Sequence, residues 1–167
     1  RDRFGVILRL DYYNQKELIE IINRSAKILS IKINEEGSKE IARRSRGTPR
    51  IANRILKRAR DFAEVESKGI IDLKIADMCL SRMGIDKNGL DDMDRRILNA
   101  IIDKFSGGPV GVESLSVAIS EDSVTVEEVY EPYLIKEGYL QRTSRGRIAL
   151  EKSYNYLNKK KKDNSQT

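Results

Sequence analysis

The sequence predicts a helix that begins at Gly47-Thr48-Pro49-Arg50 and runs to about Glu64. Thr48 is a typical capping residue, because its side-chain oxygen accepts a hydrogen bond from a backbone N–H of the first turn. Pro49 takes the first helical position, where its missing N–H costs nothing. The residues expected to face inward recur at helical spacing: Ile51, Ala52, Ile55, Leu56, Ala59, Phe62 and Ala63. A capped amphipathic helix of this length favours a mainly helical fold.

Three more helices are predicted around this one. They cover 15–29, 35–45 and a segment from Asp72 to just before Gly84. Asn14 and Asp72 are the predicted caps of the first and last of them. The pattern therefore predicts a four-helix unit over 14–84, preceded by a short strand over 6–13.

A link rich in turn-forming residues, 84–90, predicts a domain boundary. After it the apolar spacing predicts helices over 92–105 and 112–119, and a third from Ser123 or Thr125 to about Glu137 with a kink at Pro132. Two strands joined by a turn follow, over 139–142 and 147–150. Three helices and then a β-hairpin is the order of a winged helix-turn-helix.

The composition excludes several kinds of chemistry. The chain has no histidine, which excludes Ser-His-Asp and Cys-His catalysis and His-ligated metals. Its one cysteine, Cys79, allows no internal disulfide and lies at helical spacing with apolar neighbours, so a small buried core residue is predicted. No stretch approaches the roughly 20 apolar residues that cross a bilayer. Without an export signal, a cytoplasmic location is expected.

The charge of +6 is unevenly distributed. Residues 1–84 hold 19 Lys and Arg against 12 Asp and Glu, residues 86–137 hold 5 against 12, and residues 138–162 hold 8 against 1. Alternating basic, acidic and basic blocks indicate separate surfaces with separate partners. The last basic block ends in four lysines, and a disordered basic tail is expected over 158–167.

Two groups of arginines are candidates for binding anions. Arg50 lies in the first turn of a helix, where free N–H groups and the helix dipole favour an anion, although these residues alone favour an ordinary capped helix with a solvated arginine. Arg46, Arg50, Arg54 and Arg58 form a stripe of uncertain use. On the hairpin, Arg142, Arg145 and Arg147 have no acidic residue among them, which favours nucleic-acid contact over a solvated turn.

No phosphate-binding loop of the form Gly-x-x-x-x-Gly-Lys-Ser/Thr occurs, and the chain does not begin with Met. Together, the segments nevertheless resemble the RuvB family of AAA+ Holliday-junction branch-migration motors. The stretches that carry the resemblance are 1–5, 42–54, 101–105, 107–111, 131–135 and 140–147, in this order and spacing. Residues 1–13 would then end a large ATPase domain, 14–84 would form the small AAA+ helical lid and 87–157 the winged-helix head.

The resemblance also implies roles for individual residues. Arg3 matches an arginine finger that completes the nucleotide site of a neighbouring subunit, with Arg1 as the alternative. Tyr13 matches a residue that lines the nucleotide site, and Arg50 matches the sensor arginine of the lid. Arg142 and Arg147 match positions that contact DNA, with Arg145 between them. No metal ligand is expected in this chain, since ATP and Mg²⁺ would be bound mainly by an upstream domain.

The function implied is ATP-dependent branch migration in recombination, repair and the SOS response. The partners implied are Holliday-junction arms bound without sequence preference, RuvA, RuvC and a homo-hexameric ring. The acidic block 86–137 is expected to lie away from the wing. The chain departs from the family at Ser144, where proline is frequent, and in the tail Lys159–Lys162. Two alternatives remain: a stand-alone winged-helix regulator, and an adaptor lid for a separate ATPase.

Overall fold

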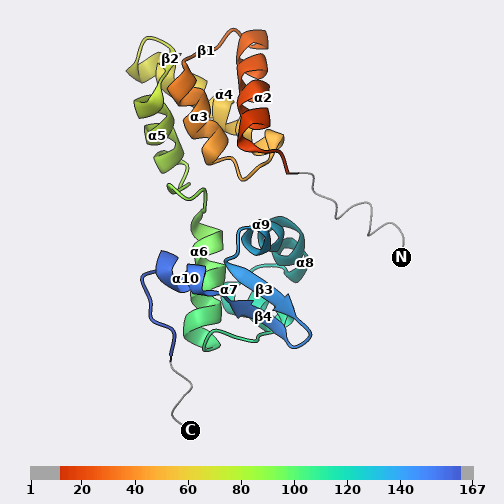
Figure 1. The fold of residues 1–167 in the computed structure, drawn as a ribbon. Coiled ribbons are helices and arrows are strands. Elements are labelled where there is room, and N and C mark those ends of the chain that lie inside the picture. Colours follow the sequence, from red (N-terminus) through yellow and green to blue (C-terminus); the bar gives the residue numbers. More distant parts are fainter. Residues whose placement is uncertain (1–11, 163–167) are drawn as a thin grey trace, which may run out of the picture. The chain divides into compact units, whose positions relative to one another are not determined.

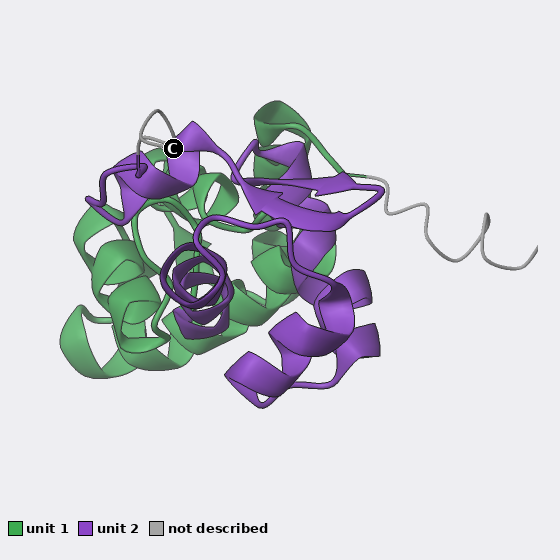
Figure 2. Ribbon diagram, turned by 90° about the horizontal axis from the view of Figure 1, so that it is seen from below, with its two compact units in different colours: residues 1–91 green, residues 92–167 purple. Residues whose placement is uncertain are grey.

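The computed structural model describes residues 12–162 (Figure 1). The chain divides between Asp91 and Asp92 into two compact units, which Figure 2 colours separately. The predicted strand over 6–13 lies almost wholly outside the described residues, and Tyr12 and Tyr13 are not in a strand. Within 12–162, no helix is long and apolar enough to cross a membrane.

The first unit is built from four helices, as predicted. They are α2 (Gln15–Ile28), α3 (Glu35–Arg43), α4 (Pro49–Glu66) and α5 (Leu73–Arg82). Their inner faces form one core, whose fully buried members include Ile22, Ile41, Ile55, Leu56 and Leu80. A short parallel pair, β1 (Lys32–Ile33) and β2 (Ile70–Ile71), was not predicted, because two-residue strands leave no periodic signal.

Each helix of this unit begins with a side-chain cap. Asn14 and Glu17 form a capping box at α2, and Thr48 and Asp72 cap α4 and α5 as predicted. Asn34, which the sequence analysis had not identified, caps α3 by accepting a hydrogen bond from the N–H of Gly37. These caps satisfy backbone donors that have no partner within the helix, so they fix where each helix starts.

The second unit has the predicted order of helices followed by a hairpin. Its elements are α6 (Asp92–Asn99), η1 (Ala100–Lys104), α7 (Val112–Ile119), α8 (Ser123–Thr125), η2 (Val126–Tyr130), α9 (Glu131–Lys136), β3 (Leu140–Thr143), β4 (Gly146–Ala149) and α10 (Glu151–Tyr156). The core includes Ile97, Leu98, Ile101, Leu115 and Leu134. The mainly helical fold class, a lid-like unit followed by a winged helix, is confirmed.

Both long helices predicted in this unit contain a wider π-helical segment. The helix predicted over 92–105 continues from α6 into η1, and the next long helix passes through η2 before α9. Pro132 lies in the first turn of α9, directly after η2. Proline has no N–H to donate to the preceding turn, so the regular helix is interrupted there. The kink predicted at Pro132 therefore takes the form of a change from π-helix to α-helix directly before it.

Beyond Leu157 the structure describes residues 158–162, and the expectation of a disordered tail over 158–167 stays a prediction. The helix α10, which was not predicted, packs the end of the unit, and the backbone N–H of Lys159 donates to the carbonyl of Tyr154 at 2.7 Å. The Lys159 ammonium also donates to Asn99 Oδ1 and to the carboxylate of Asp103. These contacts join positions about 60 apart in the sequence, which no local pattern could reveal.

Candidate nucleotide-sensing and nucleic-acid-binding sites

The start of α4 lies beside the segment that enters the first unit. The backbone N–H of Tyr13 donates to the carbonyl of Gly47 at 2.8 Å, and the Tyr13 side chain is 39% exposed. Gly47 has a φ of +72°, and a side chain there would press on the ring of Tyr12. The structure therefore brings two sequence-predicted positions, Tyr13 and the helix start that carries Arg50, to the same corner of the unit.

Arg50 is exposed in the first turn of α4, at the positive end of the helix dipole. Thr48 Oγ1 accepts the N–H of Ile51 at 3.4 Å, and no acidic residue lies in this first turn. Arg54, one turn further, is also exposed, and neither arginine forms an ion pair with any residue in the described range 12–162. Their guanidinium groups are therefore available to an anion.

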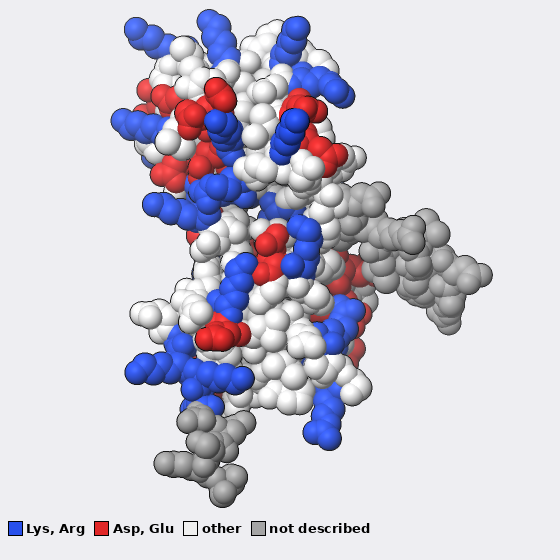
Figure 3. Space-filling model, in the orientation of Figure 1, with Lys and Arg blue, Asp and Glu red and all other residues white. Residues whose placement is uncertain are grey.

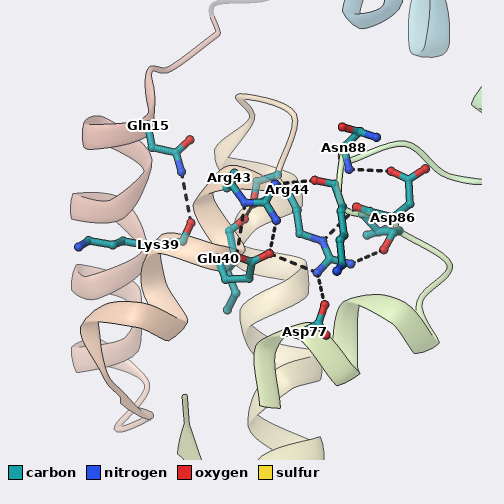
Figure 4. A network of polar contacts seen from close by, with 12 residues as sticks. Gln15, Lys39, Glu40, Arg43, Arg44, Asp77, Asp86 and Asn88 are labelled. Carbon is teal, nitrogen blue, oxygen red and sulfur yellow. Dashed lines mark hydrogen bonds and ion pairs between the residues drawn. The ribbon is translucent and has the colours of Figure 1, made fainter. Parts of the chain in front are cut away.

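Arg44 plays a structural part that the sequence analysis did not predict (Figure 4). Its side chain is 1% exposed and donates to the carbonyl oxygens of Ile85 (2.5 Å) and Asp86 (3.0 Å). It also donates to the carboxylates of Asp77 (2.8 Å) and Glu40 (3.3 Å). A buried guanidinium with this many acceptors fixes α3 to α5 and to the segment that leaves the unit.

The segment after α5 is ordered around the same arginine. The Asp86 carboxylate accepts the N–H groups of Asn88 at 2.9 Å and Leu90 at 3.0 Å, which closes a tight turn. Arg43 adds a hydrogen bond to the carbonyl of Lys87 at 2.5 Å. The link that the sequence predicted to be a domain boundary is thus anchored to the end of α3 by two consecutive arginines. The only available signal was the Arg-Arg pair itself, which does not reveal its partners.

The wing of the second unit is a two-stranded antiparallel hairpin with Thr143 opposite Gly146. Thr143 Oγ1 donates to the carbonyl of Gly146 at 2.8 Å and accepts the N–H of Arg145 at 3.2 Å, which holds the turn. Gly146 has a φ of +131°, and a side chain there would collide with the carbonyl of Val110. The backbones of Val110 and Arg147 pair through two hydrogen bonds, of 2.7 and 3.0 Å, so the base of the wing is rigidly supported.

The three arginines of the wing differ in how accessible they are. Arg145 is exposed at the tip, and its side chain forms no ion pair within residues 12–162. Arg142 is 47% exposed and donates to the carboxylate of Glu131. Arg147 is 8% exposed and donates to Glu131 Oε1 (2.5 Å) and to Glu127 Oε1 (2.9 Å).

Glu131, at the start of α9, is the centre of this network and is fully buried. Burial by itself lowers the pKa of Arg147, but the hydrogen bonds and charges of Glu131 and then Glu127 raise the pKa above its ordinary value. The expectation that the acidic block 86–137 lies away from the wing is wrong for these two glutamates. They are needed there because a buried guanidinium must be paired.

Within residues 12–162, no group of three or more His, Cys, Asp and Glu side chains could hold a metal ion. Cys79 is a free thiol and is buried, as predicted. Burial raises the pKa of this thiol, and the charge of Arg58 partly lowers it. Arg3, the expected finger, and Arg1 lie outside the described residues.

Comparison with known proteins relates both units to one family. Residues 13–86 match the model of the RuvB AAA lid domain, and residues 87–158 match that of the RuvB C-terminal winged helix domain. The Holliday junction branch migration complex subunit RuvB of Fusobacterium nucleatum is 56% identical over 159 residues, which are 95% of this chain and 48% of that protein.

Solved structures give the same relation. The Thermotoga maritima RuvB Holliday junction branch migration motor superposes with a TM-score of 0.87 at 45% identity, over 90% of this chain and 51% of that one. A point variant of the same Thermotoga protein gives a TM-score of 0.86 at 45% identity, over 90% of this chain and 50% of that one. The chain therefore spans about half the length of the relatives it matches.

Proposed function

Because the chain belongs to the RuvB family, with a lid domain and a winged-helix domain, we propose that it forms the nucleotide-sensing and DNA-contacting half of an ATP-driven branch-migration motor. The observation that carries the proposal is the start of α4. There the backbone N–H of Tyr13 donates to the carbonyl of Gly47, and Arg50 is exposed and forms no ion pair within residues 12–162. A solvated cation at a helix start is suited to sense a nucleotide phosphate.

ATP and Mg²⁺ would be bound mainly by a phosphate-binding loop outside this sequence, since the chain contains none. When bound, they would supply the phosphoryl group whose transfer powers the motor. Arg50 would contact the nucleotide of its own subunit, and Arg3 would reach that of a neighbouring subunit in a ring. Such a finger neutralises charge on the transferring group and is worth roughly 10³–10⁵ in rate.

On the DNA side, the wing tip supplies the available charge. Arg145 would contact a backbone phosphate, and the half-exposed Arg142 a second one. The role of Arg147 is better described as positioning, because its guanidinium is buried against two carboxylates. Contacts with phosphates carry no sequence information, which suits a motor that moves along any duplex.

The anchored link gives this half of the protein its mechanical role. Arg44 holds the segment 85–86 to α3 and α5, so a movement of the lid carries the start of the link with it.

The motor would act on Holliday junctions with RuvA and RuvC, as a hexameric ring in the cytoplasm. The alternative of a stand-alone regulator is disfavoured, since the lid matches the same family as the winged helix.

The experiment uses a full-length RuvB-family protein whose C-terminal half is this sequence. We expect Arg3→Ala to lower ATP hydrolysis by roughly 10³-fold or more, and Arg50→Ala to weaken nucleotide-dependent branch migration of a synthetic four-way junction. Arg24→Ala, an exposed arginine on α2, is the matched control and should leave both activities unchanged. Hydrolysis by Arg3→Ala at the normal rate would show that the finger is assigned wrongly.

A further inference from the structure

A hollow of about 380 Å³ lies where the chain leaves α10, at the end of the winged-helix unit. Its wall is formed by η1, by the turn that follows it and by the C-terminal segment. The lining residues are Ile102, Asp103, Ser106, Tyr154, Lys159, Lys160 and Lys162. None of the roles proposed above uses any of these side chains.

The lysine-bearing wall of the hollow is held in place by Lys159. Its backbone is fixed to the carbonyl of Tyr154 at 2.7 Å, and its ammonium donates to Asn99 Oδ1 at 2.5 Å. Asn158, with a φ of +56°, turns the chain back toward η1 just before it. The segment that carries the next lysines therefore starts from a defined point on the domain.

The described residues that line the hollow carry a net positive charge. Among the described residues 12–162, Asp103 is the only acidic residue that lines it, and its carboxylate is already paired with Lys159. Lys160 and Lys162 are exposed, and neither forms an ion pair within residues 12–162. Ser106 and Tyr154 add hydroxyl-bearing side chains to the wall. Two unpaired ammonium groups beside hydroxyl groups are suited to an oxyanion, and least suited to a cation or an apolar group.

Adjacent lysines differ in their relation to this hollow. Lys160 and Lys162 line it, whereas Lys161, between them, does not. Figure 3 shows basic side chains gathered at the lower end of the winged-helix unit, beside the last described residues. The wing tip lies at the opposite edge of the unit in both ribbon views (Figures 1 and 2).

We propose that this hollow binds a phosphate of the DNA backbone, as a contact separate from the wing. The occupant is a phosphodiester because the proposed function places DNA against this unit, so the inference rests on that function. The hollow would hold a phosphate at the edge of the domain away from the wing tip. DNA bound by this chain would then be gripped at two edges of the winged helix.

The test measures binding of the whole 167-residue chain to a labelled duplex of random sequence by fluorescence anisotropy, at about 50 and about 200 mM salt. Each contact with a phosphate contributes about −0.9 to the slope of log affinity against log salt concentration. A variant that has lost one contact should therefore lose roughly threefold less affinity than the unaltered chain between the two salt concentrations. We expect this change, with weaker binding at low salt, from Lys160→Gln and from Lys162→Gln. Lys161→Gln has the same change in charge and is the matched control.

The outcomes separate this inference from the proposed function. If Lys161→Gln weakens binding as much as its neighbours do, the tail acts as diffuse charge and the hollow is not a site. If Arg145→Ala abolishes binding while Lys160→Gln and Lys162→Gln have no effect, the inference fails and the proposed function stands. If the unaltered chain binds no duplex even at low salt, both fail. Inorganic phosphate can also be added as a competitor of the labelled duplex. If it displaces the duplex at the same phosphate concentration as unlabelled duplex does, the hollow is a general anion site and the proposal is overturned.

Discussion

The arginines of the two units differ in what surrounds them. Arg147, in the winged helix, is buried and held by two glutamates, whereas Arg50, at the start of α4 in the lid, is exposed and forms no ion pair within residues 12–162. From the resemblance alone, both arginines were expected to contact phosphate groups, Arg50 those of a nucleotide and Arg147 those of DNA. The comparison shows that an arginine in a basic motif can serve the fold or the ligand, and that its carboxylate partners decide which.

The lid contains its own example of the first kind. Arg44 is even more deeply buried than Arg147, and its partners are two backbone carbonyls and the carboxylates of Glu40 on α3 and Asp77 on α5. In each unit, therefore, a buried and paired arginine holds part of the structure in place, and exposed arginines without an ion pair among the described residues are left for binding.

The largest effect is expected from Glu131→Gln. This change removes the buried charge that holds Arg147 and Arg142, and breaking a buried pair by removing one partner costs about 3–5 kcal/mol. Urea unfolding followed by tyrosine fluorescence reports on this unit, because five of the seven tyrosines lie in it. The exposed Glu128→Gln is the control, and equal midpoints for the two variants would contradict the role given to Glu131.

A smaller loss is expected from Arg44→Met. The substitution leaves the carbonyls of Ile85 and Asp86 without their donor, at a cost of about 2 kcal/mol. Amide hydrogen exchange should then become faster at Gly89 and Leu90, in the turn that Asp86 closes. Arg43→Met, in a side chain that is 46% exposed, should change the free energy of unfolding by less than about 1 kcal/mol. Unchanged exchange in Arg44→Met would show that the link orders itself without this arginine.

The exposed arginines should contribute almost nothing to stability. Arg50→Ala and Arg145→Ala are each expected to change the free energy of unfolding by no more than about 0.5 kcal/mol, since neither side chain is paired within residues 12–162. Thermal unfolding followed by circular dichroism checks this. A clear loss of stability in either variant would show that this arginine supports the fold, as Arg147 does. The contrast between structural and exposed arginines would then not hold.

The smallest effect is expected from the field of an exposed arginine, Arg58, on the buried thiol of Cys79. Arg58 lowers the pKa of Cys79 and burial raises it more, so Arg58→Gln should raise the pKa further and slow alkylation by iodoacetamide. The folded state keeps the thiol proton to higher pH than the unfolded state does. This contribution to stability is therefore complete below the unfolded pKa and is lost as pH rises through the folded one. Faster alkylation in Arg58→Gln would contradict the assignment.

Much of the local structure followed from the sequence. The caps Asn14, Thr48 and Asp72 and the spacing of apolar residues predicted the four lid helices, because these signals act within one helical turn. The helix over 112–119 and the hairpin after it were predicted from the sequence as well. The π-helical segments and α10 were not, since a change of helix type and a short terminal helix leave weak periodic signals.

The candidate sites divide in the same way. The sequence by itself determined which residues carry charge and which helix start could receive an anion, because residue type and local spacing fix these properties. Only the tertiary structure decided that Glu131 pairs with Arg147, that Arg44 holds the link and that Lys159 meets Asp103. Each of these contacts joins residues more than ten positions apart. Whether a cation is available depends on such partners and on burial, which the chain acquires only when it folds.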